Sequence, residues 1–258
     1  MNAATQRALA EHTRSFYTAH AEAFSATRDH PWSGWRRVVE ALPASERRRV
    51  LDAGCGNARL AGYLASAAPS AALDYTGIDS CPALLATARS RIGSGADGDM
   101  GSDGGLQAQL LESDLSGDEL ADRLPDGPFD LVCAFGLLHH IPGFERRREL
   151  IRQLAGRLAT DGRLALAFWR FGERDRFRRR RLDWSVAPAI DRAQLEPGDH
   201  LLAWGDRDAA RYCHACDDAE IDALLAELPL RVLDDFEADG KSGDLNRYLV
   251  LVRETPRA

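Results

Sequence analysis

The stretch VLDAGCGNA, residues 50–58, decides the fold, because a short apolar run enters a glycine turn that opens an amphipathic segment. Val50 and Leu51 are typical of a buried strand. Gly54 and Gly56 allow the backbone to approach a ligand closely and to adopt dihedral angles that a side chain would forbid. A dinucleotide-binding turn would need a third glycine three residues after the second, where this chain has Arg59. A plain tight turn is the alternative interpretation of this stretch alone.

Outward from this turn, β-like runs alternate with amphipathic segments, which predicts a doubly wound α/β fold with a mostly parallel sheet. We expect strands near 48–54, 73–78, 107–112, 128–135 and 162–169. We expect helices on both faces of the sheet, near 57–68, 82–92, 116–124 and 144–158. The last segments predict a helix near 217–228 and an antiparallel hairpin at the sheet edge, from 230–236 and 246–252.

Length and composition predict one domain, because 258 residues with 45% hydrophobic content can bury one sizeable core. Its parts are an N-terminal helical cover, a cofactor-binding core, a substrate-side insertion and a C-terminal helix with hairpin, at 1–47, 48–169, 170–205 and 206–258. No signal peptide or membrane-spanning run is visible, and five scattered cysteines suit free thiols in the cytoplasm. The net charge of −7 argues against indiscriminate coating of nucleic acid.

Three further segments were weighed for function. The glycine-rich run 93–105 is expected to be a flexible surface loop. Seven arginines within Arg170–Arg181 are expected either to meet the phosphates of a nucleic acid or to form a solvated face. The run Cys213-His-Ala-Cys216 lacks a second pair of ligands at suitable spacing, so we expect ordinary thiols and no metal site.

Acidic residues follow the second and third predicted strands. Asp79 lies 23 residues beyond Gly56, where a carboxylate can accept hydrogen bonds from both hydroxyls of a ribose. Asp114 is placed to receive a hydrogen bond from an adenine amino group, and a helix N-cap is the alternative role. The fourth strand carries Asp130-Leu-Val and runs into Phe135, Gly136 and a His139-His140 pair.

These four elements in this order resemble class I S-adenosylmethionine-dependent methyltransferases. The resemblance implies a Rossmann-like sheet of seven strands with an antiparallel last strand, and S-adenosylmethionine as cofactor. It places Asp52, Gly54 and Gly56 at the methionine end of the cofactor and Phe135 beside the sulfonium. The expected cofactor-binding set is Asp52, Gly54, Gly56, Asp79, Ser80, Asp114, Leu115 and Phe135.

The flanks narrow the resemblance. Phe24-Ser-x-Thr-Arg28-x-x-Pro-Trp32, the Gly-Asp-x-x-x-x-Trp run at 198–204 and Arg211-Tyr-x-His214 are similar to methyltransferases that esterify 5-carboxymethyluridine at the tRNA wobble position. That likeness implies tRNA as a partner, and eukaryotic relatives also work with a small zinc-binding activator protein. The glycine-rich loop and the missing Trp after Asn246 depart from the family pattern.

A carboxylate acceptor is ionised near neutral pH, so methyl transfer to it needs alignment rather than a general base. We expect Arg28 or Arg211 to hold that carboxylate, although either can be a structural ion-pair partner instead. His139 is expected to shape the acceptor pocket, and for a neutral hydroxyl acceptor His139 or His140 would be the candidate base. The alternatives are a small-molecule O- or N-methyltransferase and a non-catalytic cofactor-binding partner subunit.

Overall fold

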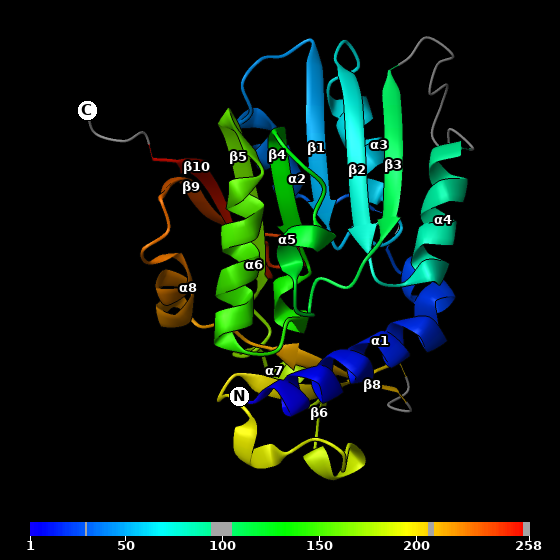
Figure 1. Cartoon of the computed structure of the whole chain (residues 1–258). Coiled ribbons are helices and arrows are strands. Elements are labelled where there is room, and N and C mark those ends of the chain that lie inside the picture. The colour runs from blue at the N-terminus through cyan, green and yellow to red at the C-terminus, as the bar shows by residue number, and fades with distance from the viewer. Residues whose placement is uncertain (29, 94–104, 206–208, 255–258) are drawn as a thin grey trace.

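The computed structural model describes residues 1–28, 30–93, 105–205 and 209–254, and its main sheet has seven strands in the order β3-β2-β1-β4-β5-β10-β9 (Figure 1). All adjacent strands pair in parallel except β10, which is antiparallel to both neighbours. This topology confirms the doubly wound sheet with one reversed strand. The strands are β1 (Arg47–Ala53), β2 (Ala72–Asp79), β3 (Leu106–Glu112), β4 (Phe129–Phe135), β5 (Leu158–Trp169), β9 (Leu230–Ala238) and β10 (Asn246–Arg253).

Helices cover both faces of this sheet, as the crossover rule requires. One core cluster packs the sheet against α2 (Gly34–Glu40), α3 (Arg59–Ala67) and α4 (Pro82–Gly93). The other packs the opposite face against α5 (Leu120–Arg123), α6 (Phe144–Gly156) and α8 (Asp218–Leu225). Two separate apolar faces explain why the central strands are buried almost end to end.

The helix expected over 116–124 is wrong in extent, because only the four residues of α5 are helical. The Asp114 carboxylate accepts hydrogen bonds from the amide and hydroxyl of Ser116, which turns the chain locally. Glu119 then adopts a left-handed conformation with φ of 61° immediately before α5. These local side-chain contacts compete with a longer helix.

A second, three-stranded antiparallel sheet lies across the carboxyl ends of the main strands, beside the long helix α1 (Ala3–Ala26) (Figure 1). Its strands are β6 (Arg181–Leu182), β7 (Asp199–Trp204) and β8 (Ala209–His214), and a short helix α7 (Asp175–Arg178) precedes it. The sequence analysis grouped 209–214 with the C-terminal helix and hairpin. The structure instead pairs this segment with β7, so the second sheet joins both sides of the 205/206 boundary.

Two smaller expectations can be compared with the structure, and a third falls largely outside the described residues. No helix within the described ranges is long and apolar enough to cross a membrane. All five cysteines carry free thiols, and Cys216 is the one that is not fully buried. The glycine-rich run 93–105 lies outside the described residues except for its two ends, where Gly93 closes α4 and Gly105 precedes β3.

Candidate functional site

One cavity of about 680 Å³ lies between the carboxyl ends of the main strands, α1 and the second sheet. Its volume falls in the range of small-molecule sites. The structure places every candidate cofactor and acceptor residue from the sequence analysis on the lining of this cavity. They are Arg28, Asp52, Gly54, Gly56, Asp79, Ser80, Asp114, Leu115, Phe135, His139 and Arg211. Their individual roles remain predictions.

The glycine turn after β1 is tied to the end of β2. Gly54 and Gly56 have φ of 76° and 55°, a region that favours glycine. The amide of Gly54 donates to the carbonyl of Ile78, and the amide of Gly56 donates to the Asp79 carboxylate at 2.9 Å. A Cβ added to Gly56 would meet nothing within 4 Å. The turn therefore leaves open space on the cavity side, where a ligand can approach the backbone.

Asp79 and Asp52 are acids held in an apolar setting. The second oxygen of Asp79 accepts from the amide of Cys81 at 2.9 Å, so backbone hydrogen bonds fix both oxygens in place. Asp52 is buried and accepts a hydrogen bond from the hydroxyl of Tyr75 at 2.6 Å. Burial raises the pKa of both carboxyls, that of Asp52 to about 6. Both carboxylates are thus rigid acceptors that line the cavity.

Asp114 serves as a local turn-former and as part of the cavity wall. One carboxylate oxygen accepts from the amide and hydroxyl of Ser116 at 2.8 and 2.6 Å, as in a capping interaction. The other oxygen lies 3.7 Å from the guanidinium of Arg14. Asp114 therefore stabilises a turn instead of capping the start of a helix. Its contact with adenine remains a prediction.

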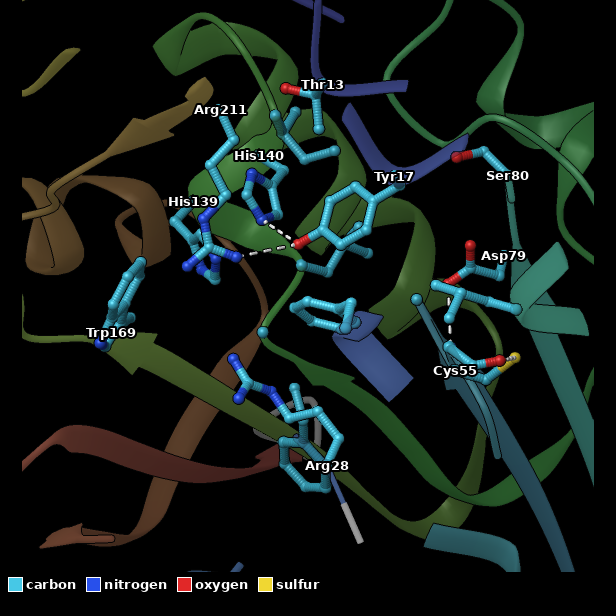
Figure 2. Close-up of a pocket in the computed structure, with 18 of the residues that line it drawn as sticks. Thr13, Tyr17, Arg28, Cys55, Asp79, Ser80, His139, His140, Trp169 and Arg211 are labelled. Atoms are coloured by element: carbon cyan, nitrogen blue, oxygen red, sulfur yellow. Dashed lines mark hydrogen bonds between the residues drawn. The ribbon is translucent and has the colours of Figure 1, made fainter. Parts of the chain in front are cut away.

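Tyr17, His140 and Arg211 form a hydrogen-bonded chain on the opposite side of the cavity from Asp79 and Ser80 (Figure 2). The carbonyl of Tyr212 accepts from Nδ1 of His140 at 2.8 Å, which leaves Nε2 as an acceptor. The hydroxyl of Tyr17 therefore donates to Nε2 at 2.8 Å and itself accepts from Arg211 at 3.4 Å. This chain fixes the tautomer of His140 and orients the phenol beside the guanidinium.

The two histidines after β4 are neutral. Burial and the nearby Arg211 lower the pKa of His140 to about 3. Burial, His140 and Arg211 likewise lower the pKa of His139 well below its usual value. Nδ1 of His139 is buried without a hydrogen-bond partner among the described residues. An orphaned polar atom on a cavity wall is a candidate contact for a ligand.

Three arginines that line the cavity and are at least half-buried have no carboxylate within ion-pair distance among the described residues: Arg28, Arg59 and Arg211. Arg211 is only 7% exposed and its Nε has no partner, while its guanidinium lies 5.2 Å from the ring centre of Trp169. Arg28 lies 4.6 Å over the ring of Phe24. Burying a cation without a counter-ion is costly, so this arrangement favours an anionic ligand.

Arg147 shows what a structurally paired buried arginine looks like in the same chain. It is fully buried and donates to Glu196 at 2.5 Å and to Glu220 at 2.6 Å. His214 lies beside this pair, hydrogen-bonded to Asp199 at 2.7 Å and to Glu220 at 2.8 Å. The histidine of the Cys-His-Ala-Cys run therefore belongs to a charged network on the far face of β8.

Three cavity residues that matter for the site were not predicted from the sequence: Tyr17, Arg59 and Trp169. Tyr17 lies in a stretch interpreted only as an amphipathic helix, and its partner His140 is 123 residues away. Arg59 was considered only as the residue that replaces a third glycine. Trp169 ends β5, and an aromatic residue at that position gives no signal in the sequence that separates a cavity wall from the core.

The chemistry of this cavity fits S-adenosylmethionine. An open glycine turn, two rigid carboxylates at Asp79 and Asp114, and unpaired guanidinium groups match a ligand with a ribose, an adenine and a carboxylate. Two orphaned polar atoms, Nδ1 of His139 and Nε of Arg211, lie with the Tyr17 group across from Asp79 (Figure 2). The cavity thus has a second polar end available to another ligand.

Comparison with known proteins agrees with this geometry. A family model described as a methyltransferase domain matches residues 51–164. A protein of Encephalitozoon cuniculi that is named as a methyltransferase is 29% identical over 220 residues, which are 85% of this chain and 87% of that protein. A crystal structure of an S-adenosylmethionine-dependent methyltransferase from Methanosarcina mazei shares the fold, with a TM-score of 0.62 at 18% identity over 85% of this chain and 98% of that one.

Two further relatives match over shorter ranges. The tRNA (carboxymethyluridine(34)-5-O)-methyltransferase of Mus musculus is 28% identical over 159 residues, which are 62% of this chain but 20% of the mouse protein. The trans-aconitate 2-methyltransferase of Variovorax paradoxus is 30% identical over 131 residues, which are 51% of this chain and 42% of that protein. This chain therefore spans a minor part of both relatives.

Proposed function

We propose that this S-adenosylmethionine-dependent methyltransferase transfers its methyl group to a carboxylate, that of 5-carboxymethyluridine at the wobble position of tRNA. The activity class and the cofactor are shown by the methyltransferase domain and by the methyltransferase relatives. The acceptor, a cytoplasmic location and an activator protein are further predictions from the sequence resemblance.

The observation that carries the proposal is the buried Arg211 without a carboxylate partner. Its Nε is orphaned, it is 7% exposed, and among the described residues Tyr17 accepts a hydrogen bond from its guanidinium. A guanidinium in this state offers a planar pair of donors to a carboxylate. The cofactor brings one carboxylate of its own, and three unpaired arginines supply enough charge for a second.

A carboxylate acceptor also suits the protonation states of the cavity. When bound, S-adenosylmethionine supplies an electrophilic methyl group on a sulfonium. A carboxylate with a pKa of about 4 attacks without losing a proton, so the residues need only align one oxygen and exclude water. Arg211 and Arg28 would hold the carboxylate, and the neutral imidazole of His139 would pack beside it. The hydrogen bonds that join Arg211 to Tyr17 and Tyr17 to His140 hold the Arg211 side chain in place on β8.

Two relatives that are named for different acceptors support methyl transfer to a carboxylate. The mouse relative is named for carboxymethyluridine and the Variovorax relative for trans-aconitate, and both names denote carboxylates. The flanks of this chain, at 24–32 and 198–214, resemble the wobble-uridine family rather than a general carboxylate methyltransferase. This combination favours the nucleoside carboxylate as acceptor.

The runner-up is a small-molecule O- or N-methyltransferase. One observation favours it: Nδ1 of His139 is neutral, orphaned and on the cavity wall, so it can accept a proton from a neutral acceptor. That reaction would need His139 as a base, whereas a carboxylate acceptor does not.

Methyl transfer from labelled S-adenosylmethionine to bulk tRNA from the host, followed by nucleoside digestion and mass analysis, tests the proposal. We expect label in a 5-methoxycarbonylmethyl-type uridine that is released by mild base, because an ester hydrolyses and an N-methyl or ether group does not. No label in tRNA, with binding of S-adenosylhomocysteine intact, would refute the tRNA acceptor and favour a small molecule.

A further inference from the structure

The arginines of the segment that follows β5 differ in whether they form ion pairs. Arg170, Arg174 and Arg178 form ion pairs with Asp218, Asp244 and Asp175. Arg176 and Arg180 form none among the described residues, are exposed, and line the mouth of the cavity. Ion pairs therefore account for the first group, and a different explanation is needed for the second.

We propose that Arg176 and Arg180 contact the phosphodiester backbone of single-stranded RNA beside the nucleoside held in the cavity. The proposal rests on the function proposed above and adds the surface by which the enzyme holds the rest of the RNA. Three features support it: the placement of these two side chains, the charge balance, and the aromatic ring of Trp204 beside them.

Phe177 holds the turn 175–181 over the cavity. Its ring packs edge-on against Trp169, with centroids 4.8 Å apart, and the guanidinium of Arg176 lies 4.5 Å over the same ring. Trp169 in turn flanks Arg211 at 5.2 Å. The rings of Phe177 and Trp169 therefore lie between Arg176 at the mouth of the cavity and Arg211, the proposed carboxylate holder. An RNA strand that contacts Arg176 can thus place a nucleoside at Arg211.

The charge balance argues for a ligand larger than a small acid. A carboxylate deep in the cavity can be met by Arg28 and Arg211, which leaves the exposed pair at the mouth without a counter-ion. The whole chain has 40 acidic and 33 basic residues, so two arginines without a carboxylate partner among the described residues run against its overall acidity. Phosphates on either side of a nucleoside would supply the missing negative charge.

Aromatic surface lies beside these arginines, because the amide of Ala203, the residue before Trp204, donates to the carbonyl of Arg180 at 2.8 Å. Trp204, at the end of β7, lines the cavity and is half-buried, with its ring 5.7 Å from Phe16 and 5.5 Å from His20. Cationic side chains combined with an exposed aromatic face are what single-strand nucleic-acid sites use, because every base has a stacking face. The mouth therefore offers both kinds of contact to an RNA strand and little to an isolated small acid.

The test compares R176A/R180A with the matched control R178A/R179A, which removes the same charge from the same turn at two residues that do not line the cavity. Binding of an anticodon stem-loop RNA carrying 5-carboxymethyluridine is measured by anisotropy over a range of NaCl concentrations. Each lost contact with a single-strand phosphate lowers the slope of log Kd against log salt by about 0.7, so we expect a drop of about 1.4 for R176A/R180A. The control should keep the wild-type slope.

Binding of S-adenosylhomocysteine and methylation of the stem-loop distinguish failure of the RNA contact from failure of the proposed function. Affinity for S-adenosylhomocysteine should be unchanged in both variants, because the four substitutions are on exposed side chains. If the wild-type enzyme methylates the stem-loop but both variants have the same slope and affinity, the RNA contact is refuted and the proposed function stands. If the wild-type enzyme binds S-adenosylhomocysteine but neither binds nor methylates the stem-loop, both proposals are refuted.

Discussion

Replacing Arg211 with methionine separates a ligand-binding role from a structural one. Methionine keeps most of the aliphatic volume and can pack against Phe16 and Trp169, whose rings lie 5.7 and 5.2 Å from the guanidinium. What the substitution removes is a cation that is 7% exposed, has no carboxylate partner among the described residues and donates one long hydrogen bond to Tyr17. The native fold therefore gains little from the charge.

We expect Arg211→Met to change the stability of the fold little and to lower the activity strongly. Removing an unpaired buried cation should change the free energy of unfolding by no more than about 1 kcal/mol, because the lost packing and the relieved burial of charge oppose each other. Losing a charge-assisted contact with the acceptor carboxylate should cost about 3 kcal/mol in the transition state, which is roughly a 150-fold fall in kcat/KM.

Arg147→Met is the matched control, because Arg147 is likewise buried but is paired with Glu196 and Glu220. Its loss leaves two carboxylates without their partner and should destabilise the fold by about 3–5 kcal/mol. Urea unfolding measures stability for both variants, and kcat/KM is measured below the unfolding transition.

The opposite pattern would refute the assignment of Arg211. If Arg211→Met unfolds as easily as Arg147→Met, while the folded fraction keeps wild-type kcat/KM, then Arg211 is a structural residue and the acceptor lies elsewhere. A loss of affinity for S-adenosylhomocysteine without any change for the acceptor would instead assign Arg211 to the cofactor.

Three further outcomes follow from the site. Asp79→Ala should weaken binding of S-adenosylhomocysteine by about 2 kcal/mol, or roughly 30-fold, in calorimetry, and an unchanged affinity would contradict the ribose assignment. With His139 and His140 neutral, kcat/KM should be flat from about pH 7 to 8, above the pKa of about 6 of Asp52, whereas a rise through a single ionisation in that range would indicate a general base. Burial alone would lower the pKa of His214, but hydrogen bonds to its carboxylate partners outweigh this and raise it to about 11. Its stabilising effect is therefore complete below about pH 6.5 and declines towards pH 11, so the stability difference between wild type and His214→Gln, measured in urea, should shrink from pH 6 to 10.

The fold of the main sheet was predictable because its signals are local. Buried strands, the glycine turn at 54–56 and the acid at Asp79 each depend on a few neighbouring residues, and the crossover rule then orders them. The helix predicted over 116–124 failed for an equally local reason, since Asp114 caps Ser116 and turns the chain. Side-chain contacts of this kind decide the ends of elements, which hydrophobic periodicity does not detect.

The sequence by itself therefore determined the fold class and predicted candidate residues that the structure places around one cavity. Only the tertiary structure decided which charges are paired. Arg147 and Arg211 look alike in the sequence, yet two glutamates neutralise one, and the other faces the cavity beside Tyr17, which lies 194 residues away along the chain. Ion pairing depends on distances between segments that are remote in sequence, and folding sets those distances.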